Sequence, residues 1–209
     1  MGRTSDANIR LMDAALDLMW EESYGAVTID DICNRAEVKK GSFYYFFKSK
    51  AELAVAALDR MWAEEWRQNL DRIFSPSIDP VARLSNYFDY IYKAQHDVVK
   101  KHGKVLGCPL CTVGSEVSTQ EIDVNAKVRE IFTRKRGYYE STIREGVAMG
   151  LIEPCDPAEK AVALAGLIEG LVSQARILND PEVMKSVSSM GMMLIGVKRA
   201  AAVPAPVTS

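Results

Sequence analysis

The chain has little of what marks a secreted or membrane protein. Residues 1–10 are mostly charged and polar, where a signal peptide needs an apolar stretch. No apolar run is long enough by this reading to span a bilayer, so we expect no membrane partner. Four cysteines among 209 residues do not suggest a disulfide framework in a chain of this size. These absences predict a cytoplasmic protein.

The usual signatures of catalysis and of cofactor binding are also missing. The sequence contains no nucleotide-binding glycine loop, no metalloprotease motif and no nucleophile–base pair with a recognisable spacing. His96 and His102 lie near a Cys-x-x-Cys pair, but no second such pair completes a tetrahedral zinc set. We therefore expect no enzyme, no cofactor and no metal. A helical enzyme that uses the cysteine pair as a redox centre is the alternative, and turnover of a thiol substrate would support it.

An overall positive charge is absent too, since the formal net charge is −2. One short segment departs from this average, because residues 35–50 carry a single acidic residue, Glu37. Its basic residues are Arg35, Lys39, Lys40, Lys48 and Lys50. Contact with phosphate depends on where the positive charge lies rather than on the net charge. The segment is therefore a candidate nucleic-acid surface.

Strand-like alternation is almost absent, whereas helical periodicity runs through the chain. Leu11, Ala15 and Leu18 share one face of a first helix, and Thr28 can cap a second one. Ser49 and Glu52 have the spacing of a capping box at the start of a longer helix. Further helices are predicted over residues 80–102, 109–118, 121–149, 157–178 and 181–199, three of them opened by an Asp-Pro pair.

The sequence thus predicts an all-α protein in two parts. Residues 4–64 are expected to form a three-helix head, and residues 65–200 a C-terminal helical bundle for ligand binding and dimerisation. Residues 201–209, with two prolines, are expected to be a disordered tail.

Two short helices joined by a tight turn, the second of them basic, are the plan of a helix-turn-helix. In that motif the start of the second helix lies nearest the bases, and its neighbours contact the backbone. Phe43 and Phe47 have the spacing of inward-facing residues. The candidate DNA-binding residues are Thr28, Lys39, Lys40, Gly41, Ser42, Tyr44, Tyr45, Lys48 and Lys50. Lys50 is expected to offer a phosphate both its ammonium and nearby helix N–H groups.

Residues 27–38 (VTIDDICNRAEV) and 40–53 (KGSFYYFFKSKAEL) resemble the N-terminal domain of TetR-type, tetracycline-repressor-like regulators. Two residues depart from the usual pattern, Cys33 in place of alanine and Phe46 in place of a frequent histidine. The resemblance implies a homodimeric, all-helical protein whose larger domain binds a small ligand and releases DNA.

The second half offers weaker signals for the ligand. A pocket between bundle helices is lined by the same residue types as a core. The pocket candidates are Trp66, Phe88, Tyr92, Cys108, Val113, Phe132 and Ile168. Aromatic residues at helical spacing are more often core residues than pocket residues.

Cys108 and Cys111 are the most unusual feature of this half. Such a pair can be a redox couple, half of a zinc site, or simply small buried residues. A position near a helix N-terminus favours the thiolate of Cys108. The Gly-Cys-x-Leu run followed by Glu116 also resembles the start of a regulatory helix in the TetR family, where some members sense electrophiles or oxidants through such a cysteine.

The last two predicted helices are candidates for a dimer interface. Residues 162–178 are apolar on much of the helix circumference, and Gly166 and Gly170 permit close approach of another helix. Burial within the same chain is the competing explanation. We therefore expect a homodimeric, ligand-responsive repressor on a palindromic operator. Activation and an adaptor role remain alternatives.

Overall fold

The computed structural model describes residues 6–117 and 120–198, so the expected tail at 201–209 lies outside the described residues. The head begins with α1 (Ala7–Glu21), whose apolar face is buried as its spacing predicted. Helix α2 (Ile29–Ala36) starts at Thr28 with a capping box, in which Thr28 and Asp31 each bind the other's backbone N–H. Glu37, in the left-handed region at φ 53°, ends this helix.

Helices α3 (Lys40–Phe46) and α4 (Lys50–Met61) complete the head. Phe43 and Phe47 are buried, as expected from their spacing. Ser49 caps α4 by accepting the N–H of Glu52. The predicted capping box is only half correct, because the Glu52 carboxylate accepts the N–H of Lys48 instead of that of Ser49.

The chain continues from α4 without a break through a π-helical turn (Trp62–Trp66) into α5 (Arg67–Ile73). The body adds α6 (Pro80–His102), α7 (Pro109–Val117), α8 (Ile122–Ala148), α9 (Pro157–Leu178), a 3-10 turn (Pro181–Ser186) and α10 (Val187–Ile195). Asp79, Asp156 and Asp180 each stand directly before a proline and accept one or two backbone N–H groups from the residues that follow it. This confirms the predicted starts of α6 and α9, whereas the helix that begins at Pro181 is a 3-10 turn. Over the described ranges the fold is all-α, with one isolated bridge between Ile152 and Val197.

The expectation of one helix over residues 181–199 was wrong. The segment starts as a 3-10 turn, and α10 ends at Ile195 because Gly196 adopts a left-handed conformation at φ 77°. Beyond it, Lys198 donates its N–H to the Leu151 carbonyl, so the chain pairs with a loop instead of continuing the helix.

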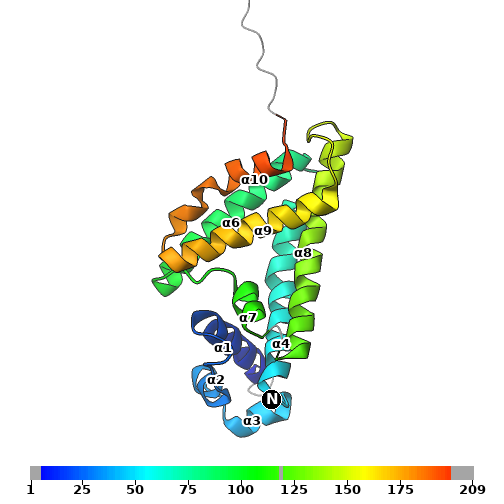
Figure 1. Ribbon diagram of the computed structural model, residues 1–209. Coiled ribbons are helices and arrows are strands. Elements are labelled where there is room, and N and C mark those ends of the chain that lie inside the picture. Colours follow the sequence, from blue (N-terminus) through cyan, green and yellow to red (C-terminus); the bar gives the residue numbers. More distant parts are fainter. Residues whose placement is uncertain (1–5, 118–119, 199–209) are drawn as a thin grey trace, which may run out of the picture.

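In Figure 1 helices α1–α3 of the head lie at one end of the molecule, and α4, the last helix of the head, runs away from them beside α8. Helix α9 packs against α8 and α10, while α7 lies between α1 and the body. By length and composition α9 could cross a membrane, so the expectation that no apolar run is long enough to span a bilayer was wrong. In the most apolar 18-residue stretch of α9, 33% of the residues are buried within the protein. An apolar helix at a core or an interface passes the same test.

Candidate DNA-binding surface and ligand pocket

The outer face of α3 is open to solvent. The side chains of Tyr44 and Tyr45 are 54% and 78% exposed, which is high for aromatic rings. A Cβ atom added at Gly41 would meet nothing within 4 Å, so packing within the chain does not require a glycine there. Lys39 is exposed beside it at the N-cap. This face is therefore shaped for a partner that approaches the helix start closely.

Other predicted DNA contacts are engaged within the head. The Lys40 ammonium lies 2.8 Å from the Asp30 carboxylate in an exposed ion pair, which raises the pKa of Lys40. The Thr28 hydroxyl is held by the α2 cap. Lys48 remains exposed, and Ser42 is half-buried.

Lys50 points inward. Its ammonium donates to the Tyr24 and Val27 carbonyls at 2.7 and 2.9 Å and lies 4.3 Å from the centre of the Tyr24 ring. Burial lowers the pKa of this lysine. In this arrangement its ammonium braces the turn before α2, and only the backbone N–H groups at the start of α4 stay available to a phosphate.

A carboxylate of the body reaches the same turn of the head. Glu116, near the end of α7, accepts the backbone N–H groups of Tyr24 and Gly25, both at 2.7 Å. The Tyr24 hydroxyl also donates to Glu121 at 3.0 Å. Helix α7 is thus joined to the head through charge-assisted hydrogen bonds, which are stronger than neutral ones.

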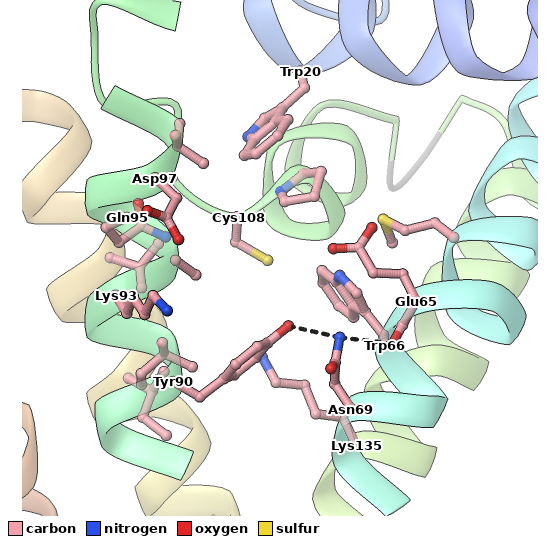
Figure 2. Close-up of a pocket in the computed structure, with 18 of the residues that line it drawn as sticks. Trp20, Glu65, Trp66, Asn69, Tyr90, Lys93, Gln95, Asp97, Cys108 and Lys135 are labelled. Atoms are coloured by element: carbon pink, nitrogen blue, oxygen red, sulfur yellow. Dashed lines mark hydrogen bonds between the residues drawn. The ribbon is translucent and has the colours of Figure 1, made fainter. Parts of the chain in front are cut away.

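A cavity of about 580 Å³ lies between the head and the body. Its walls come from α1, the π-helical turn, α5, α6, the loop before α7, α8 and α9. In Figure 2 the cavity is bordered by Trp20 of α1, by Trp66 and Asn69 of the π-helical turn and α5, and by Tyr90 of α6. The sulfur of Cys108 points into it. The volume is within the range of small-molecule sites, about 300–1,000 Å³.

Three of the predicted pocket residues, Trp66, Cys108 and Ile168, line this cavity. Four others are placed elsewhere: Phe88, Tyr92, Val113 and Phe132. Phe88 packs against α10, where a Cβ at Gly191 would lie 2.5 Å from its ring. Tyr92 donates to Glu182, and Val113 is a fully buried residue of α7.

Sequence reasoning missed most of the cavity wall, including Trp20, Lys135 and Glu169. Lys135 lies four residues from both Ile131 and Tyr139, in the apolar phase of α8, and this was a readable signal. Its buried ammonium lies 2.7 Å from Glu169 of α9. A charged residue at an apolar position is buried only when it is paired.

The two charges of this pair hold each other in their ionised forms. Burial alone lowers the pKa of Lys135, but Tyr139, Tyr87 and Glu169 reverse this and raise it above its ordinary value. Burial likewise opposes ionisation of Glu169, yet Lys135 and a hydrogen bond from Cys111 lower the pKa of that carboxyl overall. The cavity therefore contains a fixed ion pair in its wall.

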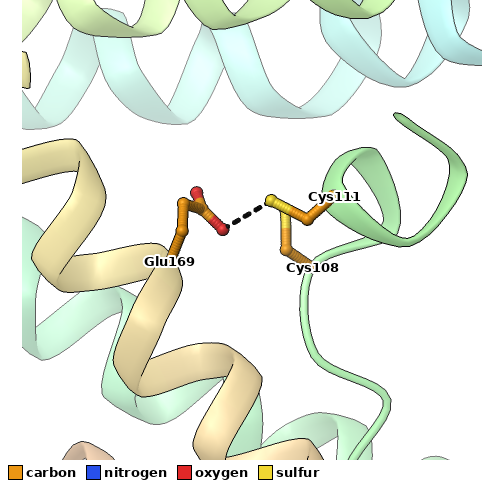
Figure 3. Close-up of side chains that lie close together, drawn as sticks. All are labelled: Cys108, Cys111 and Glu169. Atoms are coloured by element: carbon orange, nitrogen blue, oxygen red, sulfur yellow. Dashed lines mark hydrogen bonds between the residues drawn. The ribbon is translucent and has the colours of Figure 1, made fainter. Parts of the chain in front are cut away.

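Cys111 faces this pair rather than the cavity. Its thiol donates to the second oxygen of Glu169 at 2.9 Å (Figure 3). Its interaction with Cys108, burial and the Glu169 charge all raise the pKa of the Cys111 thiol, so it stays protonated. The structure thus brings both predicted cysteines beside an acidic residue that the sequence did not point to.

A helix-turn-helix head joined to a helical body with an internal cavity is the architecture of a ligand-responsive DNA-binding regulator. Residues 11–57 match the family model of bacterial regulatory proteins of the tetR family. Residues 80–190 match the tetracyclin repressor-like C-terminal domain. The chain belongs to the TetR family and is a transcriptional regulator. Regulators of this family bind operator DNA and act as dimers.

Individual relatives agree with this assignment. The chain is 28% identical to the transcriptional regulator AcuR of Cereibacter sphaeroides, over 86% of this chain and 81% of that one. It is 24% identical to the transcriptional repressor NemR of Escherichia coli, over 87% and 89%. The crystal structure of a TetR regulatory protein from Rhodobacter sphaeroides is 26% identical and matches with a TM-score of 0.78, over 90% of this chain and 98% of that one. These relatives are regulators rather than enzymes.

Proposed function

We propose that this protein is a cytoplasmic homodimeric repressor that occupies a palindromic operator and leaves it when the cavity is filled or Cys108 is modified. One observation carries the proposal: the cavity is walled by the DNA-binding head itself. Leu16, Asp17 and Trp20 of α1 line it together with residues of α5, α6 and α9. A ligand there contacts both parts of the protein at once.

An apolar surface on α9 and α10 supports a dimer through the last two helices. Leu164, Ile168 and Ile195 are buried within the chain, so part of the predicted interface belongs to the monomer core. Five large apolar side chains of these two helices are nevertheless exposed: Val162, Ile177, Leu178, Met190 and Met193. Beside them, a Cβ at Gly166 would meet nothing within 4 Å, which leaves room for another helix. Large exposed apolar side chains on two helices that pack together support a protein partner.

A twofold dimer presents two copies of α3 to DNA. Recognition helices about 34–36 Å apart enter successive major grooves on one face of the duplex. An operator with matching twofold symmetry is therefore the expected target.

Release requires that the ligand favour another arrangement of the heads. The head meets the body at the cavity wall and at Glu116. The π-helical turn at Trp62–Trp66 lies within the continuous helix that runs from α4 into α5. Such turns often mark functional positions in helices. We place the boundary between residues 4–64 and 65–200 at this turn. The Cys108 thiol in the wall offers a second trigger, namely covalent modification by a thiol-reactive compound.

The proposal is tested with the DNA that flanks the protein's own gene. We expect salt-sensitive binding of one dimer in fluorescence anisotropy, and much weaker binding of a scrambled duplex. Equal affinity for both duplexes, or no binding, would favour an adaptor role and overturn the proposal. Transcription in vitro from the same fragment separates repression from activation.

A further inference from the structure

Cys108 in the loop before α7, Cys111 in α7 and Glu169 in α9 form a compact set of three metal-ligating side chains (Figure 3). The two sulfur atoms and a carboxylate oxygen all lie within 4.8 Å of one another. Zinc binds thiolates at about 2.3 Å and carboxylates at about 2.0–2.2 Å, so two ligands of one tetrahedral ion lie about 3.5–4 Å apart. Small side-chain rotations are therefore enough to place all three on one ion.

The backbone holds the two sulfur atoms together. Gly107, at φ 75°, turns the chain immediately before Cys108, and Pro109 starts α7. Cys111 follows in the first turn of that helix. Two cysteines separated by two residues are the common spacing of a thiolate metal site. Sequence reasoning predicted no metal because it found no further ligand, but the fold brings Glu169 to the pair from 58 positions away.

Glu169 has one oxygen held and one that can bind a metal. Lys135 donates to Oε1 at 2.7 Å, whereas Oε2 accepts the thiol proton of Cys111. If the Cys111 proton leaves, Oε2 and the new thiolate both face the same point. Lys135 then acts as the outer partner that orients a ligating carboxylate, an arrangement common in metal sites.

The charge of the cluster also permits a divalent ion. Without a metal, the net charge of the cluster is zero, because it contains two neutral thiols, one carboxylate and one ammonium. Metal binding releases the two thiol protons to solvent. The net charge is then zero again, because the cluster contains two thiolates, a carboxylate, an ammonium and a divalent cation. The buried ammonium therefore leaves no net charge to be desolvated in either form.

We propose that Cys108, Cys111 and Glu169 bind one thiophilic divalent cation, such as Zn²⁺ or Cd²⁺. Thiolate ligands select these ions over Mg²⁺ and Ca²⁺. Cys108 and Glu169 both line the cavity, so the fourth coordination position faces it and stays open to water or to a ligand. The inference shares Cys108 with the proposed function but depends only on metal uptake.

Cadmium titration of the reduced, chelator-treated, full-length protein tests the site. We expect one ion per chain, seen as ultraviolet thiolate-to-cadmium absorption and as a mass increase in native mass spectrometry. Cys111→Ser keeps the Lys135–Glu169 pair and should weaken uptake at least about tenfold, since one of three ligands is lost. The matched control is the double variant Cys33→Ser/Cys155→Ser, which removes the other two cysteines and should bind cadmium like wild type.

Three results would overturn the assignment. The first is uptake that Cys111→Ser leaves unchanged, and the second is uptake that disappears in the Cys33→Ser/Cys155→Ser control. The third is a reduced wild-type chain that takes up no cadmium but loses two mass units with a disulfide oxidant, which would make the pair a redox couple. None of these measurements involves DNA, so failure of the metal site and failure of the proposed DNA release are distinguishable.

Discussion

The carboxylate of Glu116 holds the backbone N–H groups of Tyr24 and Gly25, both at 2.7 Å. It thereby fastens the C-terminal part of α7 to the turn between α1 and α2. The other end of α7 begins beside Cys108 at the cavity wall. The ammonium of Lys50, in α4, donates a hydrogen bond to the Tyr24 carbonyl of the same turn. Helix α7 therefore spans the distance between the cavity and the helix-turn-helix.

Removal of the Glu116 carboxylate should loosen this turn. In Glu116→Ala we expect the amides of Tyr24 and Gly25 to exchange with deuterium at least about tenfold faster, because a hydrogen bond to a charged group contributes about 1.5–3 kcal/mol. Gly25→Ala should act similarly, since its Cβ would lie 2.7 Å from a Glu116 oxygen. Glu140→Ala, which removes only an α8 surface pair with Arg144, is the control. Unchanged exchange at both amides in Glu116→Ala would refute the link.

Lys39 and Lys40 should each contribute to phosphate binding. Each alanine variant is expected to weaken operator binding and to flatten the plot of log affinity against log salt by about one unit. Lys40 must exchange Asp30 for a phosphate, which the weak, exposed ion pair permits. Lys104→Ala, an exposed lysine of the body, should change neither quantity. Slopes that match wild type in both head variants would remove these lysines from the interface.

The exposed apolar surface of α9 and α10 should govern assembly. A charge on this surface, as in Met193→Asp or Ile177→Asp, is expected to convert the dimer to a monomer in light scattering at micromolar concentration. Both side chains are open in the single chain, at 77% and 78% exposure, so the variants should still fold. Ile122→Asp, 82% exposed on α8, is the matched control and should remain dimeric. A wild-type monomer would contradict the assigned interface directly.

The Lys135–Glu169 pair should make stability depend on pH in acid. The folded pKa of Glu169 lies below its ordinary value of 4.5, so its contribution is present above that value and is lost as pH falls through the folded pKa. The folded pKa of Lys135 lies above 10.5, so its contribution is complete at neutral pH and is lost only as pH rises through that higher value.

Urea denaturation at several pH values measures this contribution. Lys135→Met alone should cost about 3–5 kcal/mol because it leaves a buried carboxylate unpaired, whereas Lys135→Met/Glu169→Leu should be close to neutral at pH 7. The double variant should also lose less stability than wild type below about pH 4.5. If the free energy of unfolding falls equally with decreasing pH in wild type and in the double variant, the pair does not act as described.

Local sequence signals located most of the helices because caps and breakers act over a few residues. Asp-Pro pairs marked three helix starts, and Thr28 marked the start of α2. The end of α10 was missed because Gly196 stops the helix within an otherwise apolar segment. Periodicity alone had extended that helix too far.

The cavity was harder to predict for a physical reason. Periodicity identifies the buried side of a helix but does not tell whether that side faces a cavity or another helix. Phe88 and Tyr87 are both fully buried on α6, yet only Tyr87 borders the cavity. Trp20 joins the wall through the docking of the head on the body, which no local pattern encodes. The apolar-phase position of Lys135 was a readable signal of the buried charge in this wall.

The most direct test follows operator binding before and after alkylation of Cys108 with N-ethylmaleimide. Wild type, Cys108→Ser and the Cys33→Ser/Cys155→Ser control are compared by fluorescence anisotropy. The account predicts that alkylation weakens DNA binding by wild type and by the control at least about tenfold, since allosteric couplings are typically 1–3 kcal/mol, and leaves Cys108→Ser unchanged. An identical response of wild type and Cys108→Ser would contradict it.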